Sequence, residues 1–361
     1  MSDEEHCNPN VSSECISQLE GFDLRLIMVG FGAVGRAFAQ LVTESSDMLR
    51  KQYGIALQIV AIVDRGGAVI SQEGLRISEA LSVRASTGSV AGDNILGHKG
   101  TLASSVINEV ESDVLLELTP TRLPDGEPGL SHIESAIKRG MNVVTTNKGP
   151  LAAAMPSLLE LARYQGIELK FSGTVGGGTP ILNFARKCLT GCKIESVEGI
   201  LNGTTNYILT RMSDSGIAMS EALKEAQEAG FAEADPTYDI TGLDTATKLV
   251  IIANSVMDRR VSIKDVDCEG ISNVTVQDVD KARQSGNVIK LVGRIDDSEI
   301  SVHPRTIPST SPLCVRGSLN TVLFNTDNAG TVALTGRGAG GTETSVAVLR
   351  DLIDLKKTLL T

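Results

Sequence analysis

Short apolar runs alternate with amphipathic stretches through the first half of the chain. The runs are rich in β-branched residues and are bounded by turn residues, a pattern that predicts strands. They occupy positions 24–29, 57–63, 114–120, 141–147 and 168–175. Helical spacing follows the first run and recurs at 131–139 and 151–164. Because strands alternate with helices, we predict an α/β protein with a Rossmann-type, doubly wound parallel sheet.

After this region the pattern changes to turns, several short strands and one long helix near 243–257. The change predicts an inserted α+β domain. The segment 330–355 again predicts a strand, a glycine turn and a helix, so we expect the chain to return to the first domain there. The predicted parts are a flexible tail at 1–22, a first domain at 23–172 that is completed by 327–361, and a second domain at 173–326.

A glycine-rich motif separates the first predicted strand from the first predicted helix. It reads Gly30, Phe31, Gly32, Ala33, Val34 and Gly35. The first glycine allows a tight turn, the second lets a pyrophosphate approach the backbone, and the third lets the helix pack on the strand. In this strand–turn–helix context the motif predicts dinucleotide binding by the first domain.

The second predicted strand ends in Asp64, which is followed by Arg65. An acid at this place holds the hydroxyls of the adenosine ribose, whereas an arginine neutralises a 2′-phosphate. The acid lies 29 positions after Gly35, farther than the usual spacing of about 20, which a long first helix explains. Since both residue types are present, NAD(H) stays open as the cofactor, and Arg65 favours NADP(H).

The composition limits the classes of partner and compartment. The chain has 361 residues, and 33 Lys and Arg against 44 Asp and Glu give a net charge of −11. This charge argues against nucleic acid or an anionic membrane surface as a partner. The N-terminus is acidic and polar and no run reaches 18 apolar residues, so we expect a cytoplasmic protein. Its six cysteines show no zinc-binding spacing, and we expect free thiols.

Three further glycine turns lie at predicted strand-to-helix passages, and they begin at Val175, Asn202 and Gly336. Backbone N–H groups are free at such places, so the turns suggest a ligand enclosed by backbone. Four charged residues lie in or near distinctive segments: Lys148, Glu233, Asp244 and Lys248. Asp244 and Lys248 are four positions apart, and this spacing alone favours an ordinary surface ion pair.

Taken together, the motifs resemble the homoserine dehydrogenases. The matching segments follow the order and approximate spacing of that family between residues 24 and 355; they are GFGAVG, NVVTTNKGPLA, TVGGGTPI, EGILNGTTNYILTRM, AQEAGFAEADPTYDITGLDTATKL and GRGAGGTETSVAVLRDL. The resemblance implies a short form, without the fused aspartate kinase or C-terminal regulatory domain of some relatives. It also implies a homodimer in which the inserted domain binds the substrate and forms the dimer contact.

The activity implied by the resemblance is the reversible interconversion of homoserine and aspartate 4-semialdehyde, on the route to threonine, methionine and isoleucine. By position, Lys248 becomes the group that gives and takes the proton at the substrate oxygen. Glu233 and Asp244 become substrate ligands, and Gly230 lines the same site. A free lysine has a pKa of about 10.4 and is a better acid than base at neutral pH, so we expect homoserine oxidation to run faster at alkaline pH.

The same resemblance places Lys148 near the nicotinamide and the substrate, and Thr119 and Gly340 at the cofactor. In many relatives a glutamate and backbone carbonyls hold a sodium ion near the second glycine turn. This chain has Ser172 at the position of the glutamate. A sodium site would therefore rest on carbonyl groups alone, which weakens the case for it; those groups belong to Val175, Gly177 and Thr179.

Two other hypotheses stay open at this point. One is another amino-acid dehydrogenase of similar architecture, such as an aspartate dehydrogenase. The other is a cofactor-binding sensor without turnover, which the presence of Lys248 and Glu233 disfavours. Reduction of NAD or NADP by homoserine, followed at 340 nm, separates these hypotheses from the main one.

Overall fold

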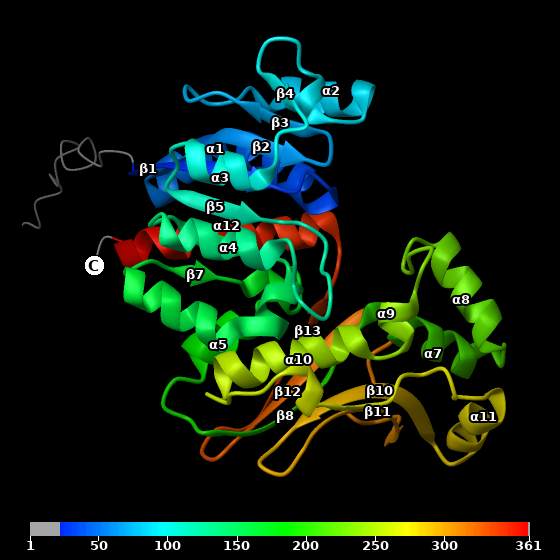
Figure 1. Ribbon diagram of the computed structural model, residues 1–361. Helices are drawn as coiled ribbons and strands as arrows, with labels where there is room; N and C mark the ends of the chain where they lie inside the picture. Colours follow the sequence, from blue (N-terminus) through cyan, green and yellow to red (C-terminus); the bar gives the residue numbers. More distant parts are fainter. Residues whose placement is uncertain (1–21, 360–361) are drawn as a thin grey trace, which may run out of the picture.

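The computed structural model describes residues 22–359, and the predicted tail therefore lies outside the described residues except for Phe22. The chain forms two sheets of seven and six strands, in the orders β4-β3-β2-β1-β5-β6-β7 and β13-β12-β8-β10-β11-β9 (Figure 1). The first sheet is built as predicted from the alternating half of the chain, and the second from the region where that pattern ends.

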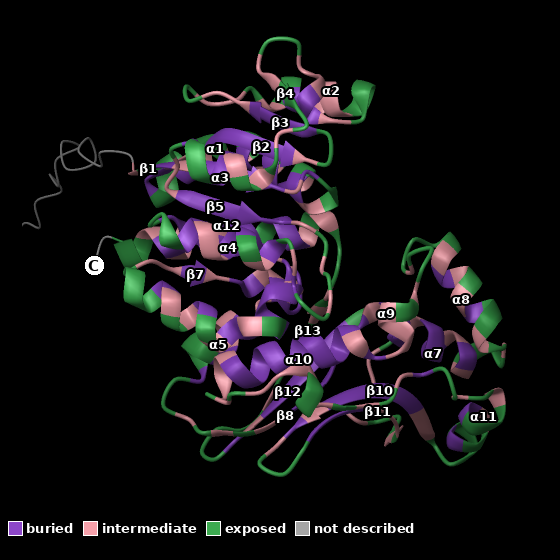
Figure 2. Cartoon of the chain, viewed as in Figure 1, coloured by how far each residue is buried: buried purple, intermediate pink, exposed green. Residues whose placement is uncertain are grey.

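The first sheet is parallel from β2 through β1, β5 and β6 to β7. Its elements are β1 (Phe22–Val29), α1 (Ala33–Tyr53), β2 (Ile55–Asp64), α3 (Ala103–Glu109), β5 (Val114–Glu117), α4 (Gly129–Lys138), β6 (Asn142–Thr145), α5 (Lys148–Gln165) and β7 (Leu169–Lys170). The central strands are buried on both faces, as is typical of a sheet covered by helices on both sides (Figure 2). The doubly wound prediction is confirmed.

One edge of this sheet is antiparallel. The elements here are β3 (Gly67–Ile70), α2 (Ile77–Thr87), the short 3-10 helix η1 (Val90–Gly92) and β4 (Gly97–Lys99). β3 follows β2 through a two-residue turn in which Asp64 pairs with Gly67. A turn this short joins only antiparallel strands, whereas a parallel pair needs a long crossover. The sequence pattern predicts only the end of a strand here, whereas the structure has a hairpin.

The second domain places helices on a largely antiparallel sheet. Its elements are η2 (Ser172–Thr174), α6 (Ile181–Cys188), β8 (Ile194–Ile200), α7 (Gly203–Ser215), α8 (Met219–Glu228), α9 (Thr237–Ile240), α10 (Leu243–Val256), η3 (Ile263–Asp265), β9 (Asp267–Cys268), α11 (Val276–Gln284), β10 (Asn287–Ile295), β11 (Ile300–Pro308), β12 (Leu319–Thr326) and β13 (Gly330–Arg337). The α+β prediction agrees with this arrangement.

The return to the first domain differs from the sequence prediction. Strand β13, which was expected to complete the first domain, pairs with β12 along its whole length in the second sheet. Only α12 (Gly341–Leu359) returns, and it packs beside α1. The apolar residues of β13 alternate with exposed ones, which suits the face of an antiparallel sheet and not the interior of a parallel one.

Helix α10 joins the two domains. It packs on α5 of the first domain and on β10 and β11 of the second sheet. Every residue from Asp244 to Asn254 is buried, so the helix is enclosed on all sides (Figure 2). A single apolar core therefore runs from the α3–α4–α5 face of the first sheet through α10 to the second sheet. The charged side chains of α10 are held between domains, away from bulk water.

Candidate active site between the two domains

The glycine motif after β1 has the geometry of a dinucleotide-binding turn. Gly30 has a φ of +104°, and a Cβ atom there would lie 2.6 Å from the carbonyl carbon of Leu118. A Cβ at Gly35 would collide with the carbonyl oxygen of Gly30. At Gly32 a Cβ would meet no protein atom within 4 Å. The protein itself thus requires the first and third glycines, whereas the second leaves open space in front of the α1 N-terminus, where a pyrophosphate would lie.

This turn lies at the crevice where the strand order reverses. β1 has β2 on one side and β5 on the other, and ligands of open α/β sheets bind beyond the strand ends at that place. Thr119, just after β5, is next to Gly30 as expected for a cofactor contact. Its hydroxyl, however, donates to the buried carboxylate of Glu117 and accepts a hydrogen bond from Asn147 at 3.1 Å. The backbone of Thr119 is the part left for a ligand.

Two of the other glycine turns converge on the first one. A Cβ at Gly341 would lie 2.9 Å from the carbonyl oxygen of Ala33, and one at Gly177 would lie 3.0 Å from that of Gly338. Gly340 has a φ of +130°, which a side chain rarely adopts. Segments some 300 positions apart in the sequence therefore meet at the start of α1. Their convergence supports the prediction of a ligand surrounded by backbone.

The charged candidates Asp244, Lys248 and Lys148 form one cluster at the N-terminal end of α10. Asp244 Oδ2 lies 2.6 Å from Lys248 Nζ, and Asp244 Oδ1 lies 3.4 Å from Lys148 Nζ. Lys248 also donates to the carbonyl oxygen of Leu201 at 2.6 Å. Asp244 and Lys248 are only 5% and 7% exposed, so the reading as a surface pair is wrong. Lys148 comes from α5, and the cluster thus spans the domain boundary.

The structure adds two residues that our sequence reasoning did not select. Asn202 uses its amide group to donate to Asp239 at 2.7 Å and to Asp244 at 2.9 Å, while its side-chain oxygen caps α7. Asp239 lies on the short helix α9. The signal for Asn202 was its place in the glycine turn NGTTN, and Asp239 stands five positions before Asp244, but nothing in the sequence showed that the three side chains touch.

The two carboxylates of this cluster are shifted in opposite directions. Burial is outweighed at Asp244 by the ammonium groups of Lys248 and Lys148 and by hydrogen bonds, which hold its pKa well below the usual range. At Asp239, burial and the negative charge of Asp244 raise the pKa. A cation beside Asp239 would lower its pKa again, because it would offset both the burial and the repulsion from Asp244. The cluster is therefore suited to receive a positively charged group of a substrate.

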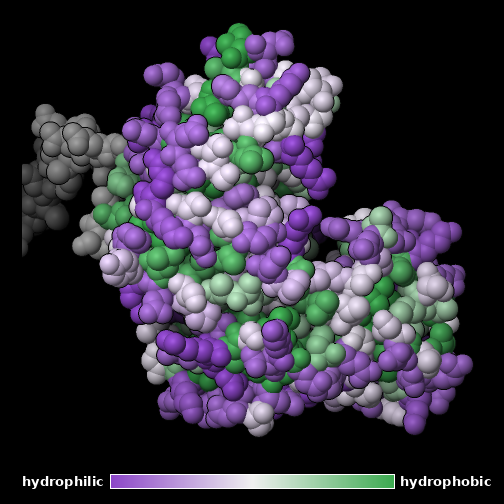
Figure 3. Space-filling view, in the orientation of Figure 1, coloured by the Kyte–Doolittle hydropathy of each residue, from purple (hydrophilic) through white to green (hydrophobic). Residues whose placement is uncertain are grey.

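The segment with Gly230 and Glu233 is not brought into this cluster. Both residues are exposed, and the backbone carbonyl of Glu233 accepts a hydrogen bond from Gln227. Figure 3 shows the surface hollowed between the first domain and the part of the second domain formed by α7, α8 and α9. The role of this segment in substrate binding stays a prediction.

The residues predicted to hold sodium agree with that role only in part. Val175, Gly177 and Thr179 are buried, but the carbonyl oxygen of Thr179 already accepts a hydrogen bond from Ile181 at 2.8 Å. Ser172 supplies no charge, and its backbone N–H donates to a carboxylate oxygen of α12. No group of three or more metal-binding side chains occurs within residues 22–359.

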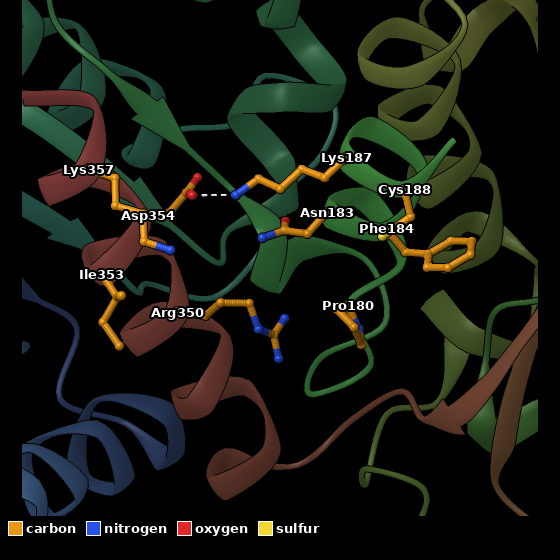
Figure 4. A pocket seen from close by; sticks show the side chains of 9 residues that line it. All are labelled: Pro180, Asn183, Phe184, Lys187, Cys188, Arg350, Ile353, Asp354 and Lys357. Carbon is orange, nitrogen blue, oxygen red and sulfur yellow. Dashed lines mark hydrogen bonds and ion pairs between the residues drawn. The ribbon is translucent and has the colours of Figure 1, made fainter. Parts of the chain in front are cut away.

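A separate cavity of about 270 Å³ lies between α6 and α12 (Figure 4). It is lined on one side by Pro180 and Phe184 and on the other by Arg350 and Ile353, and Lys187 forms an ion pair with Asp354 across it. It contains none of the predicted catalytic or cofactor residues. The predicted site therefore does not include this cavity.

A dinucleotide-binding turn, together with a buried lysine–aspartate cluster at the domain boundary, is typical of a nicotinamide-dependent oxidoreductase. The family model described as "Homoserine dehydrogenase, NAD binding domain" matches residues 30–172, and that described as "Homoserine dehydrogenase" matches residues 180–353. A relative named homoserine dehydrogenase from Methanocaldococcus jannaschii is 46% identical over 91% of this chain and 98% of its own length. The chain belongs to the homoserine dehydrogenase family.

Other relatives agree over similar lengths. One from Pseudomonas canavaninivorans, named NAD(+)-dependent homoserine dehydrogenase, is 39% identical over 93% of this chain and 97% of its own. A crystal structure of a homoserine dehydrogenase from Thiobacillus denitrificans has a TM-score of 0.81 at 31% identity, covering 94% of this chain and 74% of that one. A hyperthermophilic archaeal homoserine dehydrogenase in complex with NADPH also has a TM-score of 0.81, at 29% identity, covering 93% and 98%.

Among residues 22–359, none of the helices combines the length and the hydropathy that a membrane span requires.

Proposed function

We propose that this chain interconverts L-homoserine and L-aspartate 4-semialdehyde by hydride transfer to and from a nicotinamide cofactor. The observation that carries the proposal is the buried cluster of Asp244, Lys248 and Lys148, which joins the two domains. The names of the relatives support the same substrate pair. In this role the enzyme serves the biosynthesis of threonine, methionine and isoleucine in the cytoplasm.

Lys248 is the proton donor and acceptor at the substrate oxygen. When hydride reaches the aldehyde carbon, negative charge develops on the oxygen, and an ammonium group both stabilises this charge and supplies the proton. Asp244 and the carbonyl of Leu201 fix the position of the Lys248 ammonium from two sides. Lys148 lies on the first-domain side of the cluster. There its ammonium group helps to stabilise the negative charge on the substrate oxygen.

The amino-acid end of the substrate binds to carboxylates. A buried ammonium group requires such partners. Asp239 and Asp244 lie close together, because the side-chain amide of Asn202 donates a hydrogen bond to each. Glu233 and Gly230 complete this subsite in our proposal.

The cofactor in this proposal is NADP(H) in preference to NAD(H). The side chain of Arg65 is exposed in the turn between β2 and β3 and makes no ion pair with any described residue. A free guanidinium at the end of the second strand suits a 2′-phosphate. One relative is named as NAD(+)-dependent, so the preference is a property to be measured on this chain.

We propose a homodimer that forms through the second sheet. Every second residue of β13 is exposed on one face, and among them are Thr331, Ala333 and Thr335. Sodium, if it binds, would take carbonyl groups of residues 175–179. Analytical ultracentrifugation tests the dimer, and a comparison of activity in sodium and in tetramethylammonium salts tests the ion.

The decisive experiment follows absorbance at 340 nm with homoserine and each cofactor. We expect reduction of NADP with a rate that rises from pH 7 to pH 9, because oxidation of the alcohol needs an unprotonated base. Absence of reduction with both cofactors would refute the proposed function. A flat profile above pH 7 would remove Lys248 from the role of base.

A further inference from the structure

The carboxylate of Asp64, at the end of β2, is already surrounded by protein donors. Its Oδ1 accepts from the hydroxyl of Ser89 at 2.6 Å and from the backbone N–H of Gly66 at 2.9 Å. Its Oδ2 accepts from the N–H of Val90 at 2.9 Å and lies 3.4 Å from Arg84 Nε. The side chain is 9% exposed. Two carboxylate oxygens offer about four lone-pair sites, so three hydrogen bonds occupy most of the group, and the guanidinium of Arg84 lies beside it without a hydrogen bond.

Most of these donors come from the insertion between β3 and β4. Arg84 lies at the end of α2, and Ser89 and Val90 begin η1. The turn is shaped for this contact, because a Cβ at Gly66 would collide with the Ser89 hydroxyl. Ser89 has no spare donor either, since it gives its proton to Asp64 and accepts from the N–H of Ala91 at 3.1 Å.

An occupied carboxylate changes what the subsite recognises. In proteins of this fold the acid at the end of the second strand accepts hydrogen bonds from ribose hydroxyls, which requires free lone pairs. Here three hydrogen bonds occupy most of the lone pairs, the side chain is only 9% exposed, and Arg84 balances the carboxylate charge. The outward-facing charged group is Arg65, a donor without a partner among the described residues. The guanidinium of Arg65 can donate hydrogen bonds to a 2′-phosphate. A ribose hydroxyl in the same place would find the Asp64 carboxylate already engaged by protein donors.

We propose that Ser89 and Arg84 determine the cofactor preference by holding Asp64 away from the ribose. Asp64 is then a structural anchor for the α2–η1 segment, and the 2′-phosphate of NADP(H) is recognised by Arg65. Ser89 and Arg84 are positioning residues, because they act through Asp64 without touching the cofactor. This inference rests on the proposed function only for the identity of the cofactor.

The test measures the Kd of NADPH and of NADH separately, by nicotinamide fluorescence and without homoserine. The wild-type protein is expected to bind NADPH more tightly. Ser89→Ala frees one lone pair of Asp64 and is expected to shift the ratio of the two Kd values about tenfold toward NADH, which corresponds to about 1.4 kcal/mol. Ser86→Ala is the matched control, because that serine lies three positions earlier, on α2, and bonds only to α2 carbonyls.

A purely structural role for Ser89 predicts a different result. It would weaken both cofactors by the same factor, and this outcome, or an unchanged ratio, overturns the proposal. So does a wild-type protein that prefers NADH.

Asp64→Asn is the second variant and asks whether the carboxylate touches the ribose. Our proposal expects NADH affinity to stay within about twofold of wild type, whereas a selective loss of NADH binding contradicts it. Because the measurement needs no turnover, a failed homoserine assay would refute the proposed function while the binding ratios still decide the role of Ser89.

Discussion

The two domains each contain a nearly buried carboxylate surrounded by donors, but the donors differ in kind. Asp64 in the first domain is held by two backbone N–H groups, one hydroxyl and Arg84. Asp244 in the second domain is held by Asn202 and by two lysine ammonium groups. The groups around Asp64 hold the α2–η1 segment against the end of β2. Lysines can exchange protons with a substrate, so our proposal places only the second carboxylate in the catalytic machinery.

The same contrast separates the two binding surfaces. The cofactor crevice is built from glycines and helix N-termini, whose geometry is set by the backbone. The substrate side is built from long charged side chains, whose geometry is set by packing around α10. We therefore expect substitutions on the two sides to affect different measurements.

The largest effect is expected for Lys248→Ala. Turnover should fall about 10³-fold, because the general acid and the charge that faces the developing alkoxide are both lost. NADPH affinity should stay within about twofold, since Lys248 lies outside the crevice. Steady-state kinetics and fluorescence titration measure the two quantities, with Lys281→Ala on α11 as the control. Loss of cofactor affinity equal to the loss of turnover would erase the distinction between the two sides.

Asp244→Ala is expected to lower the free energy of unfolding by about 3–5 kcal/mol, because it leaves a buried ammonium without its counter-charge. Asp64→Ala, which leaves mainly neutral donors without a partner, should cost about 1–3 kcal/mol. Urea unfolding of both variants gives the comparison. In a Lys248→Met background the cost of Asp244→Ala should shrink, and equal costs in both backgrounds would contradict the assigned pairing.

A third carboxylate, Asp351 on α12, has no ammonium partner within hydrogen-bonding distance among residues 22–359, and burial raises its pKa to about 6. Its folded-state pKa lies above the unfolded value, so its stabilising contribution is present below about pH 4 and is lost as the pH rises through 6. Asp351→Asn should therefore stabilise the protein by about 3 kcal/mol at pH 7 and by much less at pH 4. Urea unfolding at the two pH values measures the difference.

Asp354, three positions further along α12, is the matched control with the opposite sign. Burial is outweighed there by the ammonium groups of Lys187 and Lys170, which hold its pKa below the usual range. Its contribution is present above the unfolded pKa and is lost as the pH falls, so Asp354→Asn should destabilise the protein at pH 7. The same sign for both variants would refute this assignment.

The smallest effect is expected for Arg65→Ala. Binding of NADPH should weaken about tenfold while that of NADH changes little, because only the 2′-phosphate meets the guanidinium. Fluorescence titration of the two cofactors checks this. An equal loss for both would place Arg65 against the adenine or the pyrophosphate instead.

The sequence determined the parts of this protein that depend on local chain geometry. Alternating apolar runs predicted the parallel strands, and Gly30, Gly32 and Gly35 identified the crevice because close approach and positive φ leave few other choices. The segments around Asp244 and Lys248 identified the family through their resemblance. The fold class, with its parallel sheet and second α+β sheet, and the nicotinamide type of the cofactor followed from these patterns.

Only the tertiary structure decided which side chains are buried and what they touch. The four-residue spacing of Asp244 and Lys248 describes a surface pair as well as a buried one, and enclosure of α10 between two domains made it buried. The membership of β13 in the second sheet and the occupation of Asp64 by Ser89 both depend on contacts between segments far apart in the chain. Burial and long-range pairing arise from packing of the whole molecule, and so local sequence patterns could not supply them.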